Sequence, residues 1–246
     1  MLLERITMKD FEQGLKKTRS VIIPFGSVEE HGCHLPLGTD TIHAYELANV
    51  VSKMRPVFVA PPVWYGLCRS TSEHPGTLTL TQPTLRILAM ELIKSLYSQG
   101  LENFILLSGH AGTTHMAALV DASDTVTKEL PGVSIAVLSI IDLVNRLEKG
   151  LVETKNDAHA GEVETSLMLY LRPDDVKGTS PEEYPDFPSF IITKRKLDFW
   201  PGGVWGDPSK ANVNKGEQIL IQEASLLIDL LNKLEGFNPS LEKESS

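Results

Sequence analysis

The chain has 246 residues, of which 41% are hydrophobic, and a formal net charge of -9 at pH 7. The length and hydrophobic content suit one α/β domain, which we expect over residues 1–236, followed by a polar, frayed tail at 237–246. The negative net charge argues against a nucleic-acid partner. No run approaches the roughly 18 apolar residues of a membrane span, and the chain does not open with a signal-peptide pattern. Its two cysteines are too few for a disulfide framework. We therefore expect a cytoplasmic protein without membrane contact.

The first strong element is an apolar strand at Val21 to Pro24, which leads into a segment rich in metal-ligand side chains. Side chains alternate along an extended chain, so Glu29 and His31 should face the same side. The glycines and proline that follow can turn the chain back and bring in Asp40, whose two carboxylate oxygens could bridge two cations. We interpret this segment as half of a metal site. The alternative is that its histidines and acids are ordinary, solvent-exposed side chains of a surface loop.

Helical spacing of apolar residues predicts helices across 44–51 and 85–96, with a strand at Val57 to Ala60 beside the first of them. The irregular stretch from Pro62 to Pro75 could line the entrance to the site or simply pack on the surface.

A strand at Phe104 to Leu107 runs into Ser108 to His115, which opens another helix. Reactive groups of open α/β sheets gather beyond the carboxyl ends of strands, where His110 lies. The glycines here could instead cradle a phosphate, but neither nucleotide-binding spacing is present. We therefore expect His110 to be a metal ligand and His115 to pack or face solvent.

A strand at Ser134 to Leu138 precedes Asp157 to Ser166, which enters a buried helix. Acids in a first helical turn can be explained by the helix dipole alone. Glu164, however, is followed by apolar residues three and four positions later and should face the core, with Glu162 rotated away. An inward carboxylate needs a cation or a proton, which makes Glu164 a candidate ligand.

The last part of the chain contains a long irregular stretch and a helix. Pro181 to Gly206 is rich in proline, glycine and aromatic residues and could form a lid, a subunit contact or surface packing. A helix from about Gly216 to Leu234 should pack on the sheet and end at Gly236. The alternation of strands and helices predicts a layered α/β fold.

Three segments together resemble the creatininase (creatinine amidohydrolase) family of binuclear metal hydrolases. They are G-S-x-E-x-H-G-x-H-L-P-x-G-T-D ending at Asp40, the Ser-Gly-His that ends at His110, and H-A-G-x-x-E-T-S starting at His159. The run P-G-T-L-T-L at Pro75 to Leu80 is similar to the family's as well. The resemblance implies a three-layer α/β/α fold with a mostly parallel central sheet and a homo-oligomer such as a hexamer. It also implies metal ligands at Glu29, His31, Asp40 (bridging) and His110, with His159 and Glu164 as a second essential pair.

Two departures from the family pattern bear on the site. Creatininase proper has a ligand glutamate where this chain has Gly112, and Glu164 is the natural replacement. The tryptophan-rich lid of a creatinine-specific enzyme is not evident around His159, because Trp200 and Trp205 lie well downstream in sequence. Creatinine itself is therefore not the expected substrate.

The ligand set predicts an amidohydrolase with two divalent ions per chain, zinc, manganese or iron. The ions would activate a bridging water for attack on the carbonyl carbon of a small-molecule amide, such as a cyclic amide, a formamide or a small peptide, and the C–N bond would then break. His159 would protonate the departing nitrogen. Nitrogen and oxygen donors dominate and sulfur is absent, with Cys33 a bystander.

Two alternatives remain. A two-metal phosphoesterase should place arginine or lysine beside the ions, and the three ligand segments contain neither. A non-catalytic, metal-stabilised binding module should have a closed, cysteine-rich site, unlike this one.

Overall fold

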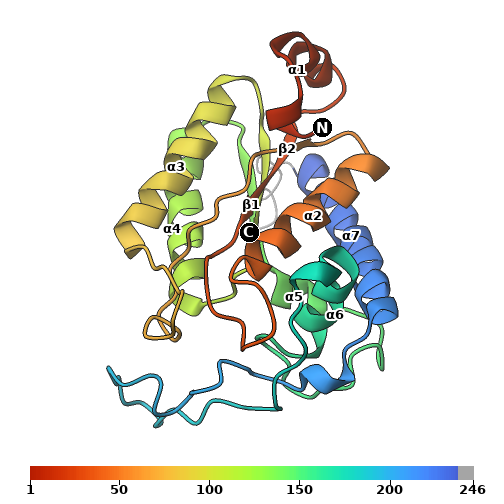
Figure 1. Cartoon of the computed structure of the whole chain (residues 1–246). Coiled ribbons are helices and arrows are strands. Elements are labelled where there is room, and N and C mark those ends of the chain that lie inside the picture. Colours follow the sequence, from red (N-terminus) through yellow and green to blue (C-terminus); the bar gives the residue numbers. More distant parts are fainter. Residues whose placement is uncertain (238–246) are drawn as a thin grey trace, which may run out of the picture.

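The computed structural model describes residues 1–237, so the expected tail at 237–246 lies outside the described residues except for its first position. A four-stranded, all-parallel sheet forms the centre, with the order β2-β1-β3-β4 (Figure 1). The strands are β1 (Ser20–Phe25), β2 (Phe58–Val59), β3 (Asn103–Ser108) and β4 (Ser134–Ser139). Val21 pairs with Phe58 on one side and with Phe104 on the other. The four expected strands are confirmed.

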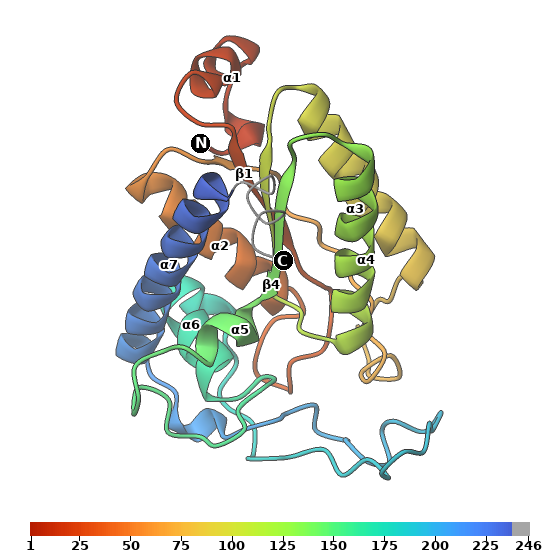
Figure 2. The same ribbon diagram turned by 180° about the vertical axis from the view of Figure 1, so that it is seen from behind.

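Helices cover both faces of the sheet, as the two opposite views show (Figures 1 and 2). One layer consists of α2 (Thr39–Met54), α5 (Ile140–Val144), α6 (Glu162–Leu171) and α7 (Val213–Gly236). The other consists of α3 (Gln82–Ser98) and α4 (Thr113–Glu129), while α1 (Met8–Leu15) lies at the end of the molecule near the N-terminus. Three 3-10 turns complete the elements, at Leu3–Arg5, Pro173–Asp175 and Pro208–Lys210. The expected three-layer α/β/α fold is confirmed.

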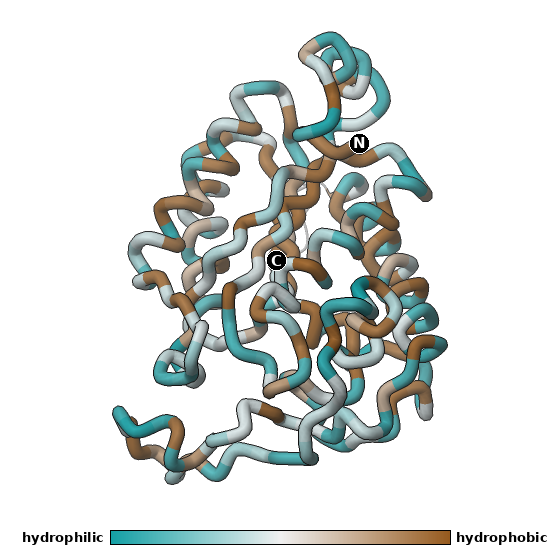
Figure 3. The backbone as a smooth tube through the Cα atoms, viewed as in Figure 1, coloured by the Kyte–Doolittle hydropathy of each residue, from teal (hydrophilic) through white to brown (hydrophobic). Residues whose placement is uncertain are grey.

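Alternation along β1 explains why the sheet is buried on both faces. Ile22 belongs to the core under α2 and α7, whereas Val21 and Ile23 belong to the core under α3 and α4. A parallel strand with two apolar faces reads as a continuous hydrophobic run, and the strands are the brown centre of the molecule (Figure 3). No helix within residues 1–237 is long and apolar enough to cross a membrane.

The last helix differs from expectation at both ends. It begins at Val213, because the Asn212 side chain accepts a hydrogen bond from the N–H of Lys215 at 3.0 Å and caps the first turn. Gly236 is its last helical residue and does not have a positive φ, so the glycine cap predicted there is wrong. Phe237 ends the helix instead by taking an extended conformation.

Candidate metal centre

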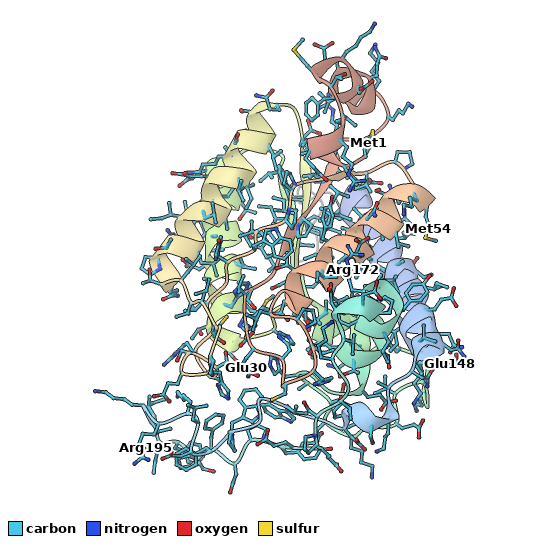
Figure 4. The ribbon with its side chains drawn as sticks, viewed as in Figure 1. Met1, Glu30, Met54, Glu148, Arg172 and Arg195 are labelled. Carbon is cyan, nitrogen blue, oxygen red and sulfur yellow. The ribbon has the colours of Figure 1, made fainter. Side chains whose placement is uncertain are left out.

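The five predicted ligands come together beyond the carboxyl ends of β1 and β3. Glu29 and His31 lie in the loop after β1, Asp40 in the first turn of α2, His110 just after β3, and Glu164 in the first turn of α6. All five are buried, the most exposed being His110 at 8%. Glu30, in the same loop, marks this lower end of the sheet in Figure 4.

The site consists of two neighbouring groups of ligand atoms. In the first, the His110 group, His110 Nδ1 lies 2.7 Å from Glu29 Oε2 and 3.3 Å from Asp40 Oδ2. In the second, the His31 group, His31 Nε2 lies 3.0 Å from Asp40 Oδ1 and 3.6 Å from Glu164 Oε2. Each carboxylate oxygen of Asp40 therefore faces a different group, as a bridging ligand requires.

Both histidines that we predict as ligands are oriented by backbone carbonyls. His31 Nδ1 donates to Glu29 O at 3.0 Å, and His110 Nε2 donates to Leu67 O at 3.2 Å. These hydrogen bonds leave His31 Nε2 and His110 Nδ1 as the nitrogens that face the carboxylates. A histidine ligand normally has its second ring nitrogen held in this way, so the two rings are prepared for metal.

Close backbone approach brings the loops to the same place. A Cβ on Gly109 would lie 1.9 Å from the carbonyl oxygen of Asp40, so only glycine allows the chain after β3 to pass α2 there. Ser27 donates a hydrogen bond to Asp40 Oδ2 at 2.5 Å and lies 3.2 Å from Glu29 Oε2. The serine therefore orients two of the carboxylates.

The site concentrates negative charge, which a bound cation would neutralise. Glu29, Asp40 and Glu164 are buried carboxylates, and within residues 1–237 none of them forms an ion pair with lysine or arginine. Burial alone would raise the pKa of Glu29, but the attraction of the neighbouring His110 lowers it to about 2. Burial likewise opposes charge on His31, yet Asp40 and Glu164 raise its pKa well above the ordinary value. Such a cluster binds either protons or metal, and its nitrogen and oxygen donors fit two divalent cations.

Glu162 and Glu164 point in different directions, as helical periodicity predicts. Glu164 faces His31, and its Oε2 accepts a hydrogen bond from Ala160 N at 2.5 Å. Glu162 is fully buried away from the site, where it accepts from Thr154 N at 2.7 Å and from Lys215 Nζ at 2.6 Å. Glu162 therefore fastens α6 to α7 and to the preceding loop.

His159 lies beside the His31 group. Its ring centroid is 4.1 Å from that of His31, and its Nε2 donates to Glu30 O at 2.8 Å. Ligand atoms of His31, His159 and Glu164 all lie within 4.8 Å of one another. This position suits either a proton donor or a further ligand, and the role of His159 stays a prediction.

The expectation that no tryptophan lies near His159 is wrong. The ring of Trp200 is centred 5.2 Å from that of His159, and Trp205 N donates to His159 O at 2.7 Å. His74 Nε2 donates to Trp200 O at 2.7 Å and fastens this segment over the site. Sequence distance was misleading because the stretch 181–206 folds back across the loop that carries His159 (Figures 1 and 2).

The expectation that sulfur is absent from the site is also wrong. Cys68 is fully buried, and its sulfur lies with ligand atoms of Glu29 and His110 in a cluster whose members are within 4.8 Å of one another. Cys33, the cysteine inside the first motif, is exposed and joins no such cluster among residues 1–237. Burial and the neighbouring Glu29 raise the pKa of the Cys68 thiol. No local signal around Cys68 indicates its place, since its partners are distant in sequence.

A cavity of about 240 Å³ opens onto the His110 group. It is lined by the buried Glu29 and His110 and by Arg69 and Lys196, among others. The stretch 62–75 therefore lines this cavity through Leu67, Arg69 and Ser70, which favours the first of its two interpretations, and 181–206 lines it through Ile192 and Lys196. Basic side chains, which the ligand segments lack, thus line the cavity from these two loops.

The remaining histidines of the motifs support the loops. His115 is buried and contacts Leu67 N at 3.2 Å and Ser108 Oγ at 3.1 Å, which confirms a packing role. Burial lowers the pKa of His115 to about 3. His34 bridges Ser180 Oγ at 2.9 Å and Thr165 Oγ1 at 2.8 Å, and it ties the first motif to α6.

Residues 4–231 match the Creatininase family, described as creatinine amidohydrolase. A mycofactocin precursor peptide peptidase from Mycolicibacterium smegmatis is 31% identical over 229 residues, which cover 87% of this chain and 84% of that protein. A 3-dehydro-scyllo-inosose hydrolase from Thermotoga maritima is 27% identical over 259 residues, which cover 94% of this chain and 81% of that protein.

Solved creatininases have the same fold. A mutant creatininase of Zn-Zn type gives a TM-score of 0.85 at 24% identity and covers 97% of this chain and 98% of its own. A structure named creatininase Mn gives a TM-score of 0.79 at 24% identity, and the match covers 97% of this chain and 99% of that one. With the family match over residues 4–231, the chain belongs to the creatininase family.

Proposed function

We propose that this protein is a metal-dependent amidohydrolase that holds two divalent cations per chain and cleaves a C–N bond. The observation that carries the proposal is the pair of ligand groups that share Asp40. Related proteins are named as a peptidase and a hydrolase, and the family as an amidohydrolase, so hydrolysis is common to all of them. Solved relatives described as Zn-Zn type and Mn support zinc or manganese, with iron a further candidate.

The chemistry divides between the cations and the chain. When bound, a pair of divalent cations lowers the pKa of water between them and polarises a carbonyl oxygen. Glu29 and His110 would hold one cation, His31 and Glu164 the other, and Asp40 both. His159 donates a proton to the departing nitrogen. Burial and the charge of His31 act to lower the pKa of His159, but Glu30, Glu29 and Glu164 together raise it, which supports this role. The cavity beside Glu29 admits a small amide.

The setting of the site in the whole protein is part of the proposal. We infer that residues 1–236 act as one catalytic domain of a cytoplasmic homo-oligomer. Support for assembly comes from the stretch 181–206, where Phe190, Ile191 and Ile192 are 106%, 66% and 82% exposed. Apolar side chains so exposed are typical of a contact surface.

The two alternatives fare differently. The open cavity does not suit a closed, structural metal site, which argues against a mere binding module. Arg69 and Lys196 supply the basic side chains that a phosphoesterase needs, so their absence from the ligand segments no longer separates the two activities. The test must therefore include phosphoesters as well as amides.

The decisive experiment combines metal analysis with a substrate panel. We expect about two divalent ions per chain, hydrolysis of an amide and not of phosphoesters, and loss of activity on chelation that zinc or manganese restores. Asp40→Ala should lose both ions, because each oxygen of Asp40 faces one group. Full metal occupancy in Asp40→Ala would overturn the bridged site, and turnover of phosphoesters alone would overturn the reaction.

A further inference from the structure

Cys68 lies beside the His110 group, which contains Glu29, Asp40 and His110. Gly112, two residues after His110, offers this group no side-chain ligand, and the glutamate that creatininase proper has there is replaced by Glu164 in the His31 group. A Cβ on Gly112 would lie 2.5 Å from His110 Nε2, so no larger residue fits there while His110 keeps its place. A further protein donor to the His110 group would therefore come from another segment, and the Cys68 sulfur lies within 4.8 Å of both a Glu29 oxygen and a His110 nitrogen.

The segment that carries Cys68 is fixed to the site at several points. Leu67 O accepts the hydrogen bond from His110 Nε2, at 3.2 Å. Cys68 N donates to Thr79 Oγ1 at 3.0 Å, and the Thr71 hydroxyl donates to Glu29 Oε1. The thiol is therefore held beside Glu29 and His110 by its own backbone, and its side chain is buried.

We propose that Cys68 binds as a thiolate to the cation of the His110 group and makes that position selective for zinc over manganese. The proposal rests on the metal centre of the proposed function. On binding, the sulfur–hydrogen bond breaks, the sulfur lone pair forms the bond to the cation, and the proton is released to solvent. Thiolate is a soft donor that suits zinc and cobalt, whereas manganese prefers harder oxygen donors. The other group contains nitrogen and oxygen donors only, so the two positions should differ in metal preference.

The competing possibility is that the thiol stays protonated and only donates a hydrogen bond to Glu29. Spectroscopy separates the two, since only a metal-bound thiolate gives a thiolate-to-cobalt charge-transfer absorption in the near ultraviolet. We would load cobalt(II) into the wild-type chain, Cys68→Ser and Cys68→Ala. Cys33→Ser is the matched control, because Cys33 is the exposed cysteine of the first motif.

The expected result is a charge-transfer band in the wild type and in Cys33→Ser that is lost in both Cys68 variants. X-ray absorption of the zinc form should show a sulfur at about 2.3 Å. The preference for zinc over manganese at one position should fall by roughly 10-fold or more in Cys68→Ser, since even outer partners of a metal site change affinity by that amount. Circular dichroism would verify that the variants remain folded.

Two outcomes would overturn the proposal and are distinguishable. A wild-type chain that binds about two cobalt ions and cleaves amides without a sulfur signal would remove Cys68 from the ligand set and leave the proposed function intact. A wild-type chain that binds no cobalt, zinc or manganese would remove both the ligand and the proposed function.

Discussion

At the scale of single residues, Glu162 and Glu164 lie on the same helical turn, but their side chains point in different directions and therefore have different partners. Glu162 and Glu164 are both buried and both belong to the first turn of α6. Glu162 is neutralised by Lys215 and by backbone N–H groups, and although burial opposes charge on it, these contacts lower its pKa. Among residues 1–237, Glu164 pairs with no lysine, and it faces His31. The first carboxylate is satisfied by the protein, and the second is available to a cation.

The pair provides a matched test. Glu164→Gln should lose the ion of the His31 group, because a neutral amide is a poor substitute for an inward carboxylate. Glu162→Gln should keep both ions, but it should lower the free energy of unfolding by about 1–3 kcal/mol, since Lys215 loses a charged partner. Elemental analysis and urea denaturation of both variants measure these effects. If both variants lost the same amount of metal, the assignment of Glu164 from its direction would be wrong.

His159 tests the proton-donor role. We expect His159→Ala to retain both ions and to lower kcat by about 10² to 10⁴ with a smaller effect on KM. The loss should be largest for amides whose departing nitrogen is most basic, because these need a proton most. Steady-state kinetics across an amide series, with metal content determined on the same samples, checks this. Loss of an ion would instead make His159 a ligand of the His31 group, which its position also permits.

At the scale of elements, the metal centre is built from strand ends and helix starts. Asp40 and Glu164 occupy the first turns of α2 and α6, where the helix dipole favours negative charge. Asp157 accepts from the N–H groups of Glu162 and Val163, at 2.8 and 2.9 Å, and fixes where α6 begins. Strand β3 delivers His110 from the neighbouring position in the sheet.

Local sequence patterns could predict these elements, because strand alternation and helical periodicity are local properties. They also indicated Glu29, His31 and Asp40, which are close together in the chain. They could not indicate Cys68, whose partners come from distant segments, nor the contact of Trp200 with His159. Such contacts depend on how long loops cross the end of the sheet, and no periodicity encodes that path.

A buried ion pair joins α2 to α7. His43 Nε2 lies 2.7 Å from Glu223 Oε2, and both side chains are at most 1% exposed. Burial acts to lower the pKa of His43, but the charge and hydrogen bond of Glu223, together with the charges of Glu164 and Asp40, raise it above the ordinary value. The pKa of His43 is therefore higher in the folded protein than in the unfolded chain, where it is about 6.5. The pair contributes its full stabilisation of the fold at pH values below about 6.5, and this contribution is lost as pH rises through the pKa of the folded state.

We therefore expect Glu223→Gln to destabilise the fold by about 3–5 kcal/mol near pH 6, because it removes one partner of a buried pair. The difference in free energy of unfolding between Glu223→Gln and the wild type should decrease as pH increases above the raised pKa of His43. Urea unfolding between pH 5.5 and roughly 9.5 measures it, within the range where histidine and lysine titrate. Glu46→Gln is the control on the same helix, since Glu46 pairs with an exposed Arg172. A difference that stayed constant or grew with pH would contradict the ion pair.

At the scale of the whole molecule, the candidate metal centre gathers loops and helix starts at one end of the sheet. The predicted ligands come from the loop after β1, the start of α2, the loop after β3 and the start of α6, and 181–206 packs over them through Trp200. The same stretch extends away from the body to Arg195 at its tip (Figure 4). Stability at this end of the sheet should therefore depend on metal, unlike stability in the apolar core beneath α3 and α4.

Removing the metal should weaken this end selectively. Chelation leaves Glu29, Asp40 and Glu164 buried together, so we expect the melting temperature to fall and amide hydrogen exchange to increase in 26–40 and 157–166. A cation at about 100 times its Kd stabilises by about 2.7 kcal/mol per site. Because protons compete with metal for these ligands, the difference between loaded and chelated protein should diminish as pH falls. Exchange in α3 should not change, and an equal increase there would mean that the metals support the whole fold and not this end alone.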